Sequence, residues 1–336
     1  MICDAESLEL SQSIETILGD LPDDLPGYVK PELMQSVLEV ATLPCGGVAE
    51  AGDQLRRLRR TVREVAAKNG LAIGAAGTHP AALYEDQLIV DRPRYKELAA
   101  ELSWIAEQEL IFGTHVHVGI DDAEKAIYVA DGIRGYLPLL LGMSSNSPLW
   151  RGKTTGMMSS RTPVFRAFPR VGIPPYYGTW NIYSHRVEQM MRGGAIPDYT
   201  YLWWDVRPHP NLGTVELRVF DQQTRVEHTI GFAALSQALA HRLAADYDEG
   251  VPSIEHPHEL IDFDHGLEVP GEKMTRGVID ELREHAQELG CAAELAILDD
   301  LAENGTGARR QLDWLSDHGE IGGMMGEIVA ATDPDA

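Results

Sequence analysis

The sequence predicts an α+β fold, in which a mainly antiparallel sheet carries helices on its outside. Residues 113–119 and 214–221 each alternate polar and apolar side chains with period two, as strands with one buried face do. Helical patterns lie between and after the strand-like runs, and they fill most of the chain beyond residue 253. We therefore expect one face of the sheet to bear ionisable groups and the other to face the core.

The remaining elements follow from apolar spacing and from turn residues. Strands are expected at residues 1–4, 31–43, 71–77, 111–120, 201–207 and 214–221. Helices are expected at residues 11–19, 48–69, 94–110, 121–143, 180–192, 225–248, 275–289, 291–303, 307–317 and 320–331. Gly70 is predicted to cap the second helix, and Pro138 to kink the helix of 121–143. His79 precedes a proline and is expected to be a turn residue.

The domain organisation is predicted to be a single catalytic domain, 1–336. Residues 1–250 would form the sheet-bearing core, and residues 251–336 a C-terminal helical portion. Residues 144–179 are rich in Ser, Thr, Pro, Arg and aromatic residues, which is typical of an ordered functional loop. We expect this loop to border the active site.

Charge and cysteine content restrict the partners. The formal net charge of −24 argues against nonspecific binding to nucleic acid or to anionic membranes, whose phosphates it would repel. No apolar run is long enough to span a membrane, and no basic segment followed by an apolar run is present at the start. Three cysteines without CxxC spacing support neither a disulfide framework nor a zinc-thiolate site. A reducing cytoplasm is the expected location.

The two alternating runs predict the candidate site. His115 and His117 would share one strand face, and Glu216 and Arg218 would share another. Either strand alone could be an ordinary solvent-facing strand. Taken together, histidines beside a glutamate and an arginine suit an anionic ligand held next to a metal ion.

Two further carboxylates are candidates for that metal site. Glu39 lies in the run 31–43 and Glu32 at its entrance. Their separation of seven residues places them on opposite faces of a regular strand, so a shared site would require a bulge or a bend. With Glu39, Glu32, His115 and Glu216 as ligands, carboxylates outnumber imidazole, which favours Mg²⁺ or Mn²⁺ over Zn²⁺.

Arg161, in the predicted loop, and Arg218 are the cations that we expect to neutralise phosphate or carboxylate oxygens near such ions. The sequence holds neither a P-loop nor a GxGxxG motif after a strand, so any nucleotide would bind in another way.

Seven segments together resemble the type 2 glutamate-cysteine ligase, or carboxylate-amine ligase, family of the glutamine synthetase-like superfamily. They are PELMQSVLEVAT, FGTHVHVGI, SSNSPLWRG, SSR, LWWDVRPHP, TVELRVFD and GTGARRQ, in this order along nearly the whole chain. The resemblance implies a curved antiparallel sheet of about six strands that forms a funnel, with ATP entering from one side and two or three Mg²⁺ ions inside.

The resemblance also implies roles for single residues. Glu32, Glu39, His115 and Glu216 match metal-binding positions, and Arg161 and Arg218 match positions that contact phosphate. His117 is expected to bind substrate. The implied reaction joins a carboxylate, such as the γ-carboxylate of glutamate, to an amine, such as that of cysteine, through an acyl phosphate made from ATP.

The chain departs from this family pattern at its start. Family members begin with a glutamate-rich strand that supplies further metal ligands, and this sequence begins where that strand should end. A segment expected before Gly266 is also shorter. The alternatives are therefore a catalytically silent relative that binds or regulates, or a metal-dependent hydrolase that uses His115, His117 and Glu216. The sequence does not fix the acceptor amine, the acyl donor or the oligomeric state, and a homodimer is compatible with it.

Overall fold

The computed structural model describes residues 1–253 and 271–335 and has the α+β architecture that the sequence predicts. The strands are β1 (Ile2–Asp4), β2 (Gly27–Pro31), β3 (Leu38–Thr42), β4 (Leu71–Ile73), β5 (Gly113–Gly119), β6 (Leu149–Trp150), β7 (Lys153–Thr154), β8 (Val171–Gly172), β9 (Trp203–Trp204), β10 (Val206–His209) and β11 (Thr214–Asp221). The larger helices are α2 (Val48–Lys68), α3 (Pro93–Leu102), α5 (Ala123–Arg134), α6 (Leu137–Ser144), α8 (Trp180–Arg192), α9 (Val226–Asp248), α11 (Gly271–Glu288), α14 (Gly307–His318) and α15 (Ile321–Ala331). The shorter ones are α1 (Ile14–Gly19), α4 (Trp104–Glu107), α7 (Arg161–Phe165), α12 (Ala292–Ala296), α13 (Asp299–Asn304), and the 3-10 turns η1 (Tyr84–Asp86) and η2 (Tyr199–Tyr201).

The central sheet has the strand order β10-β11-β5 and is antiparallel throughout. Its register places Glu216 opposite His117 on one side and opposite Arg207 on the other. The register of β11 against β5 shifts between Leu217 and Phe220, as it does at a β-bulge. The other described strands form two-stranded pairs: β1-β4, β2-β3 and β6-β7 are antiparallel, and β8-β9 is parallel. The largest hydrogen-bonded sheet of the described chain therefore has three strands, fewer than the about six that the resemblance implies.

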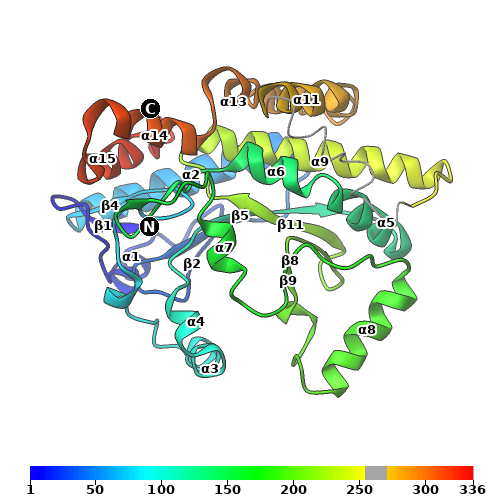
Figure 1. The fold of residues 1–336 in the computed structure, drawn as a ribbon, viewed down its shortest axis with the longest axis horizontal. Helices are drawn as coiled ribbons and strands as arrows, with labels where there is room; N and C mark the ends of the chain where they lie inside the picture. Colours follow the sequence, from blue (N-terminus) through cyan, green and yellow to red (C-terminus); the bar gives the residue numbers. More distant parts are fainter. Residues whose placement is uncertain (254–270, 336) are drawn as a thin grey trace.

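The apolar face of β11 lies against α9. Val215, Leu217 and Val219 are almost fully buried in the largest hydrophobic cluster, and the ring of Phe220 lies 4.9 Å from that of Phe232 on α9. Figure 1 shows α9 along one side of this sheet with α11 and α13 outside it, whereas α3, α4 and α8 lie on the other side. Because side chains alternate along a strand, Glu216 and Arg218 point away from α9.

Residues 31–43 are predicted as one strand, but they hold the turn and the second strand of a hairpin that spans residues 27–42. β2 ends at Pro31 and β3 begins at Leu38, with the two strands paired so that Lys30 faces Glu39. Residues 32–37 make separate backbone bonds, including Ile2 N to Ser36 O at 2.8 Å. The apolar residues in this turn, which the pattern attributes to a strand, are buried because other segments cover them.

Two predicted helices are each divided in two. The helix of 94–110 breaks at Ser103, whose φ of 51° lies in the left-handed region. The helix of 121–143 ends at Arg134, and Pro138 stands in the first turn of the new helix α6, where its missing N–H costs nothing. Apolar spacing continues across both breaks, so periodicity alone does not detect them.

The helix of 48–69 ends where Gly70 adopts a φ of +67°, as its glycine cap predicts. His79 is a buried turn residue, as expected, and its Nδ1 accepts from the N–H groups of Ala81 and Ala82. The predicted loop 144–179 contains β6, β7, α7 and β8 and is largely ordered by its own short elements. Its place beside the active site stays a prediction.

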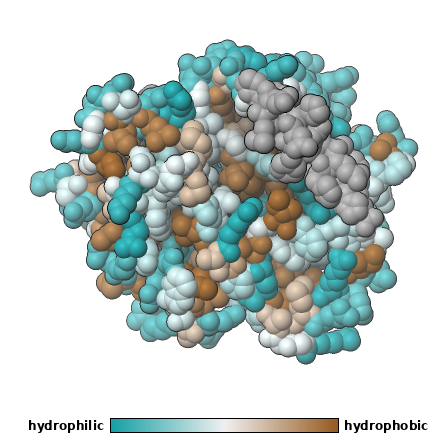
Figure 2. Space-filling view, viewed as in Figure 1, coloured by the Kyte–Doolittle hydropathy of each residue, from teal (hydrophilic) through white to brown (hydrophobic). Residues whose placement is uncertain are grey.

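The surface in Figure 2 carries hydrophilic residues over most of its rim, and apolar residues form separate patches between them. Within residues 1–253 and 271–335, every helix is either too short or too polar to cross a membrane.

Candidate active site

Glu216 is the centre of a charged group on the polar face of the sheet. Its side chain is 3% exposed and lies between two arginines. Its Oε2 accepts from Arg207 Nε at 2.6 Å, and its Oε1 accepts from Arg218 Nη1 at 2.6 Å. Burial alone would raise the pKa of Glu216, but the positive charges of Arg218 and then Arg207 hold it well below its usual value. Glu216 is therefore a carboxylate at neutral pH.

The two histidines of β5 stand over the same carboxylate. His115 Nδ1 is 3.9 Å and His117 Nε2 is 3.7 Å from Glu216 Oε1, and both side chains are about one-third exposed. The pKa of each is lowered, first by burial, and for His115 next by the charge of Arg218. His117 Nδ1 is also 3.0 Å from Thr214 Oγ1. Both imidazoles are neutral at pH 7 and can offer a lone pair to a metal ion or substrate.

A second acidic group lies beside the first. Glu32 is close enough to Glu39 for a side-chain hydrogen bond, although the two are seven residues apart. The hairpin explains this, because Glu32 follows β2 and Glu39 lies within β3. The pKa of Glu32 is raised, mainly by burial and then by the negative charges of Glu109 and Glu39.

Glu109 connects the acidic group to the sheet. It lies a few residues before β5, the strand that carries His115, and burial raises its pKa to about 7. Arg218 and Arg161 are near enough to oppose that rise. Through Glu109, the carboxylates that are predicted to bind metal lie next to the arginines that are predicted to contact phosphate.

The four predicted metal ligands lie in two pairs, His115 with Glu216 and Glu32 with Glu39. Among the described residues, no three of Glu32, Glu39, His115 and Glu216 place ligand atoms within 4.8 Å of one another. A set spread in this way suits more than one ion. Carboxylate oxygens are the ligands that Mg²⁺ and Mn²⁺ prefer, so these side chains fit either ion. Their negative charges repel one another where they are buried, and a bound divalent cation would remove that repulsion.

Arg161 lies inside the structure and binds β11 backbone. Its side chain is 6% exposed; Nη1 donates to Val219 O at 3.3 Å and Nη2 to Arg218 O at 3.1 Å. These carbonyls belong to the part of β11 where the register against β5 shifts, so they are free to accept from a side chain. The structure therefore gives Arg161 a support role for the strand of Arg218; its predicted contact with phosphate stays a prediction.

A glycine makes room for this arginine. A Cβ on Gly113 would overlap the Arg161 guanidinium, including Cζ at 2.8 Å. We expect Gly113→Ala to displace Arg161 and to lower the free energy of unfolding by about 1–3 kcal/mol, the usual cost of overpacking. Denaturant unfolding would measure the change. Gly119→Ala is the matched control, because a Cβ at that end of β5 meets nothing within 4 Å. Equal stabilities for the two variants would contradict this packing.

Asp221 is the last residue of β11 and lies beside Arg161. It is fully buried and accepts hydrogen bonds from Asn146 N at 2.8 Å, Ser147 Oγ at 2.7 Å and Ser159 Oγ at 2.9 Å. Arg161 Nη1 stands 4.0 Å away. This network fixes the two serine-containing segments of residues 144–160 to the end of β11.

Arg207, Glu109 and Asp221 belong to the site in the structure but are absent from the site that the sequence predicts. Arg207 could have been found, because strand 206–209 must pair with 214–221 and an arginine facing Glu216 follows from that register. Glu109 lies in a helical pattern whose break after Leu102 carries no clear signal. Asp221 ends the alternating run of 214–221, and nothing in that pattern marks it as a hydrogen-bond acceptor.

Comparison with known proteins identifies the family. The model of glutamate-cysteine ligase family 2 matches residues 3–331. A Rubrobacter xylanophilus protein named "Putative glutamate-cysteine ligase 2-1" is 39% identical, over 99% of this chain and 93% of its own. A Solibacter usitatus protein named "Putative glutamate-cysteine ligase 2" is 34% identical, over 91% of this chain and 84% of its own.

A solved structure shares the fold. The bifunctional glutathione synthetase of Pasteurella multocida aligns with 99% of this chain at a TM-score of 0.63 and 13% sequence identity, and the chain spans 50% of that protein's length. The likeness supports the α+β architecture described above. With a family model that matches almost the whole sequence and relatives more than 30% identical, the chain belongs to glutamate-cysteine ligase family 2.

Proposed function

We propose that the protein is an ATP-dependent ligase that joins the γ-carboxylate of glutamate to an amine, such as that of cysteine, through an acyl phosphate. The observation that carries this proposal is the position of Arg218. Its Nη1 is held by Glu216, while its Nε is buried and has no hydrogen-bond partner in the described part of the chain. A buried guanidinium with one free donor suits an anionic group that is present only when substrate is bound.

The first step needs charge stabilisation more than it needs a nucleophile on the protein. A substrate carboxylate oxygen attacks the γ-phosphorus of ATP, the bond to ADP breaks, and negative charge spreads over the phosphoryl oxygens. Arg218 would stabilise that charge, and Glu216 and Arg207 would fix its position. Arg161 would hold the strand that carries Arg218.

The acidic residues would hold Mg²⁺. Glu32, Glu39 and Glu109 supply oxygens on one side, and Glu216 and neutral His115 supply an oxygen and a nitrogen on the other. When bound, the ions would neutralise phosphate oxygens of ATP. The second step is attack of the amine on the acyl carbon, with release of phosphate and of a proton from the amine nitrogen. His117 would face the substrates.

The free thiols of Cys3, Cys45 and Cys291 support our placement of the protein in the cytoplasm, where thiols stay reduced. The proposed substrates, ATP, glutamate and an amine, are small molecules.

The test is ADP release with Mg²⁺-ATP and glutamate against a panel of amino acids and amines. We expect ADP to form only when ATP, divalent metal, glutamate and an accepted amine are all present. ATP binding without turnover on any amine would support the silent relative. Tight Zn²⁺ binding with no nucleotide binding would support the hydrolase.

A further inference from the structure

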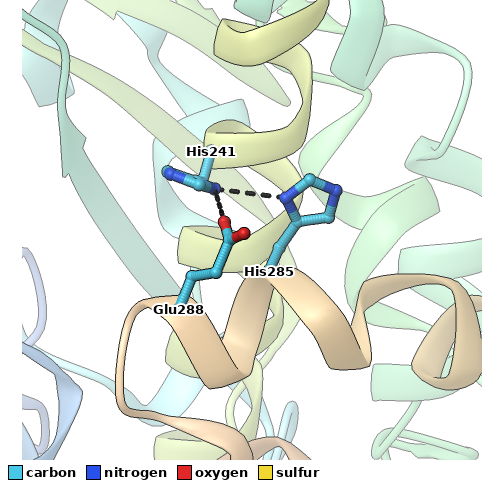
Figure 3. A group of neighbouring side chains, drawn as sticks. All are labelled: His241, His285 and Glu288. Carbon is cyan, nitrogen blue, oxygen red and sulfur yellow. Dashed lines mark hydrogen bonds and ion pairs between the residues drawn. The ribbon is translucent and has the colours of Figure 1, made fainter.

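A second group of metal-type ligands lies outside the candidate active site, between α9 and α11. His241 comes from α9, and His285 and Glu288 come from α11 (Figure 3). His241 Nδ1 is 3.2 Å from His285 Nδ1 and 3.8 Å from Glu288 Oε2. Among the described residues, this is the one trio of histidine, cysteine or acidic side chains whose ligand atoms all lie within 4.8 Å of one another.

The spacing agrees with tetrahedral coordination. Zinc–nitrogen bonds of about 2.0–2.1 Å place two tetrahedral ligands about 3.3–3.4 Å apart. The two imidazole nitrogens, 3.2 Å apart, are already close to that separation. Glu288 Oε2 lies 3.8 Å from His241 Nδ1 and within 4.8 Å of the His285 ligand atom, and because the side chain is 58% exposed, its carboxylate can move to close the remaining distance.

The ligand chemistry differs from that of the active site. Two imidazoles and one carboxylate favour Zn²⁺ and related transition metals, whereas Mg²⁺ favours sites made of oxygen. Three protein ligands would leave the fourth position to water. The neighbouring cation, Arg242, is paired with Glu281 and Asp246, so its charge is largely offset.

The packing of helices α9 and α11 brings the three side chains together. His285 and Glu288 are three residues apart on α11 and therefore share one face of that helix. His241 is 44 residues earlier in the chain and reaches them because α11 packs on α9. A bound ion would thus connect two helices that are separate in sequence, and one of them lies directly on the catalytic sheet.

We propose that His241, His285 and Glu288 form a binding site for Zn²⁺, or for a transition metal of the same class, that fastens α11 to α9. Binding to the folded chain alone stabilises it by mass action. The site is independent of the proposed ligase reaction.

The test uses the full chain, freed of metal by chelation and then kept in excess Mg²⁺ so that the carboxylate-rich site is occupied. Zn²⁺ is added in calorimetry and in thermal unfolding. We expect one tight equivalent and a rise in melting temperature of roughly 4 °C at a hundredfold excess over Kd. His285→Ala and Glu288→Gln should remove the tight equivalent and the rise.

His185→Ala is the matched control, because His185 is an exposed histidine on another helix, α8. It should bind Zn²⁺ as the wild type does. Co²⁺ adds an independent readout, since a tetrahedral site gives it intense visible absorption that His285→Ala should abolish. The proposal is overturned if His285→Ala and Glu288→Gln keep the same equivalents, the same melting shift and the same Co²⁺ spectrum as the wild type.

Discussion

Arg218→Ala should lower ligase turnover by about 10²- to 10³-fold, the typical cost of removing one preorganised donor to developing charge. Arg218 is 12% exposed and is aimed by its 2.6 Å contact with Glu216. The fold should survive, since Leu217 and Val219 keep their places in the core and Glu216 keeps its bond to Arg207. Steady-state ADP release gives the turnover, and thermal unfolding with circular dichroism checks the fold.

Arg192→Ala is the control for that experiment. Arg192 is 78% exposed and pairs with Glu188 on α8, so its loss should change neither turnover nor stability measurably. A folded Arg218→Ala protein with wild-type turnover would reduce Arg218 to a counter-ion for Glu216 and would remove the main support for the proposed function.

The central sheet could be predicted because its signal is local. Alternation in 113–119 and 214–221 requires one apolar face, and the nearly complete burial of Val215 and Leu217 follows. The hairpin at 27–42 could not be read in the same way. The apolar residues of its turn, Leu33, Met34 and Val37, are buried because β1 and other segments cover them, and such tertiary burial leaves no period in the sequence.

The candidate site was predictable to the extent that it lies on those two strands. His115, His117, Glu216 and Arg218 do share one face, as alternation requires. The direction of Arg161 was not predictable, because it depends on carbonyls released by a register shift in another strand. Glu32 and Glu39 come together only through the hairpin that the pattern missed.

Glu216→Ala should destabilise the protein more than any surface substitution. Glu216 is the shared counter-ion of Arg207 and Arg218, which are 8% and 12% exposed. Removing one member of a buried charge group typically costs about 3–5 kcal/mol, because the remaining charges lose their partner. Glu188→Ala, at an exposed ion pair, should cost at most about 1 kcal/mol. Urea unfolding at pH 7 measures both variants.

The same variant should change how stability depends on pH. The arginines hold the pKa of Glu216 in the folded protein below the value of about 4.3 expected when it is unfolded. A group with a depressed pKa stabilises the fold above its unfolded pKa and loses that effect as the pH falls through the folded value. The stability difference between wild type and Glu216→Ala should therefore be full near pH 7 and should shrink below about pH 4. A difference that stays constant down to pH 3 would mean that Glu216 acts by packing, and the charge network would then not be what fixes Arg218 for catalysis.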